Sequence, residues 1–213
     1  MGTRRVDWID GMIHYSTDIS FPEPGAGTSA SLANGSADNQ VFLVTVLADT
    51  TYLAKIDNST GATTGPVAFP SLGRYQTPLI TVTSDNRIVL CGKLGDAIAM
   101  LKVDPRTMSL DWSQTLPGAA ETVTDIAPPT QGAVCFSGKV PRYRSQNDLF
   151  VARLSSSGTL QFSTYINGPG NANDFASSIA VAPDGFLLAA GVLYVGPDTR
   201  AALLRFHPIT GQL

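Results

Sequence analysis

The sequence predicts an all-β fold, a β-propeller of about four four-stranded blades, because one strand-like segment recurs four times along its 213 residues. The four copies are LAKID (53–57), MLKVD (100–104), VARLS (151–155) and LLRFH (203–207). Each copy places a cation at the same position, and the spacings are 47, 51 and 52 residues: Lys55, Lys102, Arg153 and Arg205. A period of that length, made of strand-like units, is typical of a propeller or another repeat array.

Two further strands per repeat are visible around a turn of Asp, Asn or Gly, which is the chemistry of a tight hairpin. The apolar run that follows the turn lies within 37–45, 84–92, 130–138 and 183–191. The run that precedes it lies within 78–83, 122–127 and 177–182. No segment shows the 3.6-residue periodicity of a helix.

A fourth strand follows in each repeat. MSLDWSQTL (108–116) aligns with GTLQFSTYI (158–166), so that Trp112 and Phe162 are equivalent, and 61–69 is a weaker counterpart. The last repeat lacks this strand, and we expect the N-terminal segment 4–15 to complete it, because closure removes open sheet edges. The predicted single domain 1–213 therefore consists of repeats at about 30–69, 78–116, 122–166 and 177–213 plus 4–15.

The segment NGPGNANDFASSIAVAPDGFLLAAG (167–191) resembles the β-propeller repeat of bacterial surface and secreted proteins, which is often seven-bladed. It shares a Gly-rich loop, an Asp before an aromatic residue, an Ile-Ala-Val strand and an Asp-Gly turn. The resemblance implies the fold and an extracellular module, and it implies little about activity. Seven blades would need about 350 residues, so the chain closes as four blades, is a fragment of a larger propeller, or assembles from several copies.

The composition excludes some partners. The net charge is −3 and no run of Lys and Arg occurs beyond short pairs, whereas nucleic-acid binding requires a concentrated cationic surface. No apolar run approaches the ~20 residues of a membrane span. Residues 1–15 show no signal-peptide pattern. The low charged fraction of 15% and the scarcity of Lys favour an extracellular or cell-surface location.

The candidate binding residues lie on the Gly- and Pro-rich loops that precede the first strand of each repeat, which we expect to emerge at one end of the propeller. They are Arg74, Tyr75, Glu121, Asn171, Asn173 and Asp174. One interpretation is a polar and aromatic recognition surface. The alternative is that a carboxylate such as Asp174 or Glu121 only caps loop amides.

The four repeated cations have a structural and a functional interpretation. They are either a ring of charges for an anionic ligand, or repeated contacts between neighbouring strands and blades with stems that cover apolar surface. An Asp recurs upstream of each cation, at Asp49, Asp96, Asp148 and Asp198. Because these positions are on strands, away from the loops, we favour the structural interpretation.

No catalytic, metal or cofactor site is predicted. The only histidines, His14 and His207, have no partners for a zinc site, which needs about four converging ligands. No Gly-x-Ser-x-Gly motif is present. Cys91 and Cys135 leave equivalent strands on the same face, so neighbouring blades do not bring them together. We expect two free, buried thiols.

The leading hypothesis is a non-enzymatic propeller that acts as a binding or scaffold module and takes a protein or a glycan on the long-loop face. A second hypothesis is a hydrolase or lyase acting on a sugar or lactone, with Glu121 and Asp174 as acid and base. The third is a structural subunit of a filament or ring. An unpaired strand edge at 4–15 or 200–206 would favour this hypothesis.

Overall fold

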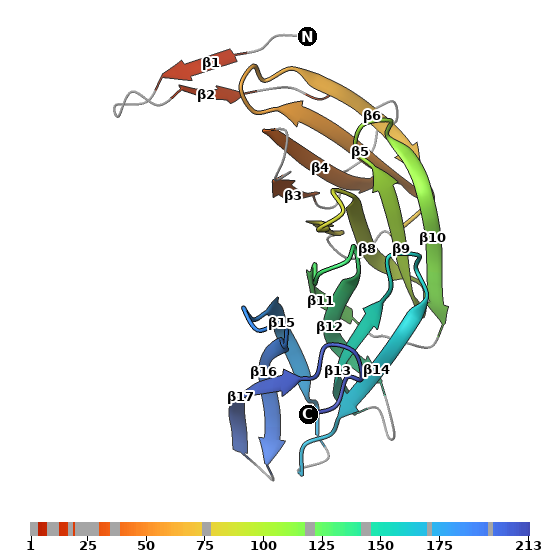
Figure 1. Cartoon of the computed structure of the whole chain (residues 1–213), viewed down its shortest axis with the longest axis vertical. Helices are drawn as coiled ribbons and strands as arrows, with labels where there is room; N and C mark the ends of the chain where they lie inside the picture. Colours follow the sequence, from red (N-terminus) through yellow and green to blue (C-terminus); the bar gives the residue numbers. More distant parts are fainter. Residues whose placement is uncertain are drawn as a thin grey trace.

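The computed structural model describes residues 4–7, 13–16, 19, 30–34, 39–73, 78–117, 122–141, 146–169, 172–195 and 198–213. Within these ranges all regular structure is β-strand, so the all-β class is confirmed. The strands form four antiparallel sheets of three or four strands and one two-stranded hairpin. The four sheets, here called blades 1 to 4, follow one another along an open arc (Figure 1).

Each blade is formed by strands that are consecutive in the sequence. Blade 1 contains β3 (Ala30–Asn34), β4 (Gln40–Leu47), β5 (Thr50–Asp57) and β6 (Thr63–Phe69). Blade 2 contains β7 (Leu79–Val82), β8 (Ile88–Leu94), β9 (Ala97–Asp104) and β10 (Ser109–Pro117). Blade 3 contains β11 (Thr122–Ala127), β12 (Val134–Pro141), β13 (Asn147–Leu154) and β14 (Leu160–Ile166). Blade 4 contains β15 (Phe175–Val181), β16 (Leu187–Val195) and β17 (Asp198–Phe206).

The first strand of each blade lies on the concave side of the arc, as β3, β11 and β15 show, and the fourth strands β6, β10 and β14 lie on the convex side (Figure 1). Neighbouring first strands are in contact, β3 with β7, β7 with β11 and β11 with β15. This arrangement follows from the hairpin turns, because each turn places the next strand one position further from the concave side.

The predicted closure of blade 4 by residues 4–15 is wrong. β1 (Arg4–Asp7) pairs instead with β2 (Ile13–Ser16), with Arg4 opposite Ser16. This hairpin lies at the blade 1 end of the arc, far from β17 (Figure 1). The dipeptide Asp10–Gly11 is a strong hairpin signal between the two runs. A local pairing also closes a far shorter loop than pairing with β17 would, and so loses less chain entropy.

The hydrophobic core lies between the blades. One cluster joins blades 1 and 2, a second joins blades 2 and 3, and a third joins blades 3 and 4. In β8 of blade 2, Leu90 belongs to the first cluster and the adjacent Cys91 to the second. Because successive side chains of a strand point to opposite faces, a blade packed on both sides needs a continuous apolar run.

A glycine recurs where the second strand of a blade passes the first. A Cβ added to Gly138 would lie 2.0 Å from the carbonyl oxygen of Thr122, and one added to Gly191 would lie 2.2 Å from that of Phe175. No side chain fits at those distances, so the close approach of the two strands explains why the repeat carries glycine there.

Candidate functional site

Two of the six predicted binding residues, Asn173 and Asp174, lie in the described part of the chain. The other four, Arg74, Tyr75, Glu121 and Asn171, lie outside the described residues. The predicted recognition surface therefore remains a prediction for those four positions.

Asp174 is a fully buried carboxylate that caps the loop between blades 3 and 4, with 0% of its surface exposed. Its Oδ2 accepts a hydrogen bond from the backbone N–H of Gly168 at 2.5 Å, and its Oδ1 accepts one from the N–H of Tyr194 at 2.7 Å. Both oxygens thus hold main-chain donors, which is the strong form of side-chain capping. In this geometry the carboxylate fixes the loop against β16.

Asn173 also contacts the main chain. Its Oδ1 accepts a hydrogen bond from the backbone N–H of Asn147, the first residue of β13, at 3.1 Å. The backbone N–H of Asp174 donates to the carbonyl of Asn147 at 2.8 Å. Together these bonds attach the loop to both neighbouring blades. A ligand-binding role of Asn173 and Asp174 stays a prediction beside these structural contacts.

Three of the four repeated cations connect their blade to the next one. Lys55 Nζ donates to the carbonyl oxygen of Pro105 at 3.4 Å, and Lys102 Nζ donates to that of Ser156 at 3.1 Å. Arg153 Nη1 donates in the same way to the carbonyl of Pro208. The three acceptors occupy the same position in their blades, in the turn after the third strand. These contacts support the structural interpretation of the cation series.

Lys102 is the most completely satisfied of these cations, with 2% of its surface exposed. Besides Ser156, its Nζ reaches Asp85 Oδ2 at 2.7 Å and the carbonyl of Gly132 at 3.0 Å. An ammonium has three donors, and here all three have acceptors. Burial by itself raises the pKa of the Asp85 carboxyl, but the hydrogen bonds from Lys102 and Thr83 and the Lys102 charge hold that pKa below its ordinary value.

Arg205, the last cation of the series, binds within its own blade. Its Nη2 lies 2.6 Å from Asp184 Oδ2, and its guanidinium carbon lies 3.8 Å from the centre of the Phe186 ring. The residue remains 55% exposed at its side chain. Arg205 therefore differs from Lys55, Lys102 and Arg153, which reach a neighbouring blade.

Asp125 joins the concave strands of blades 3 and 4, a role that the sequence reasoning missed. Its Oδ2 accepts hydrogen bonds from Ser178 Oγ at 2.7 Å and from the Ile179 N–H at 2.9 Å. The neighbouring Thr124 donates to the carbonyl of Ala176 at 2.7 Å. The sequence signal was the polar pair Thr124–Asp125 between the apolar residues Val123 and Ile126. Both residues support the scaffold.

Metal ligation and thiol chemistry find little support in the described ranges. Those residues contain no group of three or more His, Cys, Asp or Glu side chains that would hold an ion. The prediction of two free, buried thiols is confirmed for Cys91 and Cys135. Burial raises the pKa of the Cys135 thiol to about 12, and it raises the pKa of Cys91 as well. Neither thiol is therefore ionised near neutral pH.

His207 accepts backbone hydrogen bonds from Ile209 and Thr210 at its Nδ1 atom.

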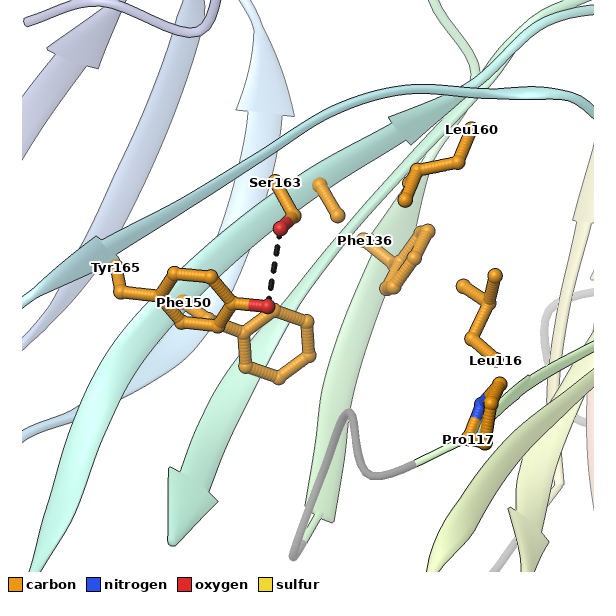
Figure 2. A pocket seen from close by; sticks show the side chains of 8 residues that line it. Leu116, Pro117, Phe136, Phe150, Leu160, Ser163 and Tyr165 are labelled. Atoms are coloured by element: carbon orange, nitrogen blue, oxygen red, sulfur yellow. Dashed lines mark hydrogen bonds between the residues drawn. The ribbon is translucent and has the colours of Figure 1, made fainter. Parts of the chain in front are cut away.

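A groove of about 180 Å³ lies between blades 2 and 3, near the convex side. It is lined by Leu116, Pro117, Phe136, Phe150, Ala152, Leu160, Ser163 and Tyr165 (Figure 2). The only side-chain polar groups in this lining are two hydroxyls, and Ser163 Oγ donates to Tyr165 Oη at 2.9 Å. The wall is otherwise aliphatic and aromatic, with Phe150 tilted at 34° to Tyr165. This groove, here called the blade 2–3 groove, is therefore suited to an apolar group.

The comparisons with solved structures show the same fold at low sequence identity. The chain superposes on hydrazine synthase of Kuenenia stuttgartiensis with a TM-score of 0.59 and 14% identity, covering 89% of this chain and 48% of that one. For TolB of Acinetobacter baumannii the TM-score is 0.51 at 16% identity, with coverage of 95% and 46%. For an engineered GH43 glycoside hydrolase it is 0.50 at 15% identity, with coverage of 87% and 40%.

The fold is a β-propeller. At these identities the likeness shows the fold alone. The propeller arc of this chain spans less than half the length of each of the three proteins. No protein-family model matches the sequence, and no curated protein matches it. In the described part of the arc, no helix has the length and apolarity that crossing a membrane requires.

Proposed function

We propose that this propeller arc is a non-enzymatic binding module that recognises a protein partner through an apolar side chain seated in the blade 2–3 groove. The observation that carries the proposal is the chemistry of the groove lining, which is aliphatic and aromatic around a single hydroxyl pair. Binding pockets are commonly apolar concavities with few polar groups, and aromatic or aliphatic anchors dominate protein interfaces.

A protein side chain suits the groove better than a glycan. Sugar recognition needs several polar groups that reach the ligand hydroxyls, and here the hydroxyls of Ser163 and Tyr165 bind one another. Tyr165 is exposed at the rim, whereas Phe136 and Phe150 are buried in the wall. An aromatic or branched aliphatic group gains favourable burial there, at about 25 cal/mol per Å² of apolar surface.

The hydrolase or lyase alternative draws no support from Asp174. A general acid or base must reach the reacting group, and both oxygens of this buried carboxylate already accept main-chain hydrogen bonds. The long-loop face stays a second candidate surface through Arg74, Tyr75, Glu121 and Asn171. An extracellular or cell-surface location, proposed from the composition and from the resemblance of residues 167–191, is compatible with such a module.

The test is a selection of random displayed peptides on the immobilised wild-type protein, followed by affinity measurement of the enriched peptides by fluorescence polarisation. We expect the enriched peptides to share one aromatic or aliphatic residue. Ser163→Trp fills the groove and should weaken their binding by about tenfold or more.

The chain offers a matched control. Ser113 in β10 pairs with Leu101, and Ser163 in β14 pairs with Ala152, and both partners precede a repeated cation by one residue. Ser113→Trp therefore makes the same change at the equivalent position of blade 2. Peptides that lose affinity equally for both variants, or a selection that enriches no peptide, would remove the proposal.

A further inference from the structure

The two most exposed large apolar residues in the described strands lie at opposite ends of the arc. Leu203 in β17 of blade 4 is 70% exposed, and Leu32 in β3 of blade 1 is 64% exposed. β3 lies toward one end of the arc and β17 at the other (Figure 1). Exposed leucines at these two positions are unusual for this repeat, because their equivalents in the other blades are covered.

Leu203 precedes its repeated cation by two residues, as do Leu53, Met100 and Val151 in blades 1 to 3. Each of those three residues is 0% exposed and belongs to the core that its blade shares with the next. In blade 4 the same face carries Leu188 and Ala190, which pair with Arg205 and Leu203 and are half-buried. This face, here called the blade 4 end face, has the chemistry of a blade contact.

Leu32 lies on the other face of its blade, the face that in blades 3 and 4 packs against the preceding blade. It pairs with Leu43 in the same way as Ile126 pairs with Phe136 and Ile179 with Ala189. Ile126 and Ile179 are buried in the cores that their blades share with the preceding blade. The face of blade 1 that carries Leu32 and Leu43, here called the blade 1 end face, is therefore the complement of the blade 4 end face. The hairpin β1–β2 lies at this end and leaves Leu32 exposed.

The repeated cation gives an independent pointer to the same contact. In the three contacts within the arc, the cation of one blade donates to the backbone carbonyl of a fixed position in the next blade, at Pro105, Ser156 or Pro208. The residue at this position in blade 1 is Asn58, which is exposed. Arg205 is the cation at the blade 4 end face, and within the described residues it reaches no other blade.

We propose that the blade 4 end face of one copy binds the blade 1 end face of a second copy of this chain. Leu203 packs beside Leu32 of the other copy, and the Arg205 guanidinium donates to the carbonyl of Asn58. One chain carries both halves of the repeating contact, so two copies related by a two-fold axis form it twice and close a ring. Two arcs of four blades stay within the ~4–8 blades of known propellers. The aligned part of this chain also covers only 40–48% of the three aligned proteins.

The contact surface is separate from the blade 2–3 groove, so its test is independent of the proposed function. The test measures mass by light scattering after size exclusion, for the wild type, Leu203→Asp, Leu32→Asp and the control Leu94→Asp. Leu94 is an exposed leucine of β8 between the two ends. We expect twice the 22.4 kDa chain mass for the wild type and the control, and loss of the two-copy species for Leu203→Asp and Leu32→Asp.

Mixing the two end variants separates this contact from other pairings. Leu32→Asp keeps an intact blade 4 end face and Leu203→Asp keeps an intact blade 1 end face, so an equimolar mixture should recover a two-copy species through one contact. A dimer that Leu32→Asp leaves intact would show a symmetric pairing of blade 4 faces and would overturn the proposal. A wild type that stays a single copy at all concentrations would overturn it as well.

A cross-link provides a second readout that does not depend on the stability of the Asp variants. The double variant Leu32→Cys/Leu203→Cys should be joined between copies by a short bismaleimide, because the two positions lie at opposite ends of one chain. Cys91 and Cys135 are buried and give no background reaction. A product with the mass of one chain only would contradict the contact.

Discussion

Lys102 Nζ lies 2.7 Å from Asp85 Oδ2 and also donates to two backbone carbonyls of the following blade. The charge at this position of the repeat is therefore a buried connection between blades 2 and 3. Lys55 and Arg153 make the equivalent backbone contact at the other blade boundaries. The stability of the arc depends on these contacts together with the three apolar clusters.

Replacing Lys102 tests the contribution of this connection. Lys102→Met keeps the apolar stem but removes the donor to Asp85 and to the Gly132 carbonyl, and it leaves the Ser156 carbonyl with Trp112 Nε1 as its donor. We expect a loss of about 3 kcal/mol in the free energy of unfolding and a Tm lowered by roughly 6–12 °C. Arg106→Met, the same kind of change at a cation of blade 2 whose side chain is 73% exposed, should cost less than about 1 kcal/mol. Equal losses in urea titrations of the two variants would contradict the assignment.

The stability of the arc should fall in acid because the folded pKa of Asp85 is depressed. A group of this kind stabilises the fold above its unfolded pKa and loses that contribution as the pH falls through the lower folded value. We expect the free energy of unfolding to decrease below about pH 5. Asp85→Asn should show a smaller difference between pH 7 and pH 3 than the wild type in urea titrations. An unchanged difference would argue against the pair.

Asp174 should be required for folding stability. Asp174→Asn replaces one acceptor oxygen with an N–H₂ group that faces a main-chain N–H, either that of Gly168 or that of Tyr194. We expect a loss of about 2–3 kcal/mol in the free energy of unfolding, measured by urea titration. Full stability, combined with the loss of a binding activity, would instead place Asp174 in a ligand site.

The two thiols should be unreactive in the folded protein. Cys91 and Cys135 are buried and their raised pKa values keep them protonated at pH 8. A thiol reagent such as Ellman's should modify neither residue in buffer and both residues in concentrated urea. Rapid modification of one thiol in buffer would show that its blade opens or that its burial is misassigned.

The repeat architecture could be predicted because the signals are local and recur. The turn before each second strand and the cation of the third strand mark every blade in the sequence, and a glycine marks three of them at Gly92, Gly138 and Gly191. The segment 4–15 was misassigned because its partner was chosen from the need to close the propeller, without regard to the hairpin signal at Asp10–Gly11. Whether this segment pairs locally or with a distant strand depends on the difference in free energy between the two pairings, which a single sequence does not give.

The groove and the end faces could not be predicted because they depend on contacts between distant segments. Leu116 and Tyr165 meet only after blades 2 and 3 have packed, and neither residue belongs to a recognisable motif. Leu203 aligns with apolar residues of the other third strands, which are all buried, so nothing in the sequence marks it as exposed. Of the six predicted loop residues, Asn173 and Asp174 have structural contacts, and Arg74, Tyr75, Glu121 and Asn171 remain predictions.

We propose that the polar residues of the repeat hold the arc together while the blade 2–3 groove binds the partner. The most direct measurement compares Ser163→Trp and Asp174→Asn for both unfolding free energy and affinity toward the selected peptides. We expect that Ser163→Trp loses affinity with little change in stability, and that Asp174→Asn loses stability with little change in affinity. The opposite assignment of the two losses would contradict it.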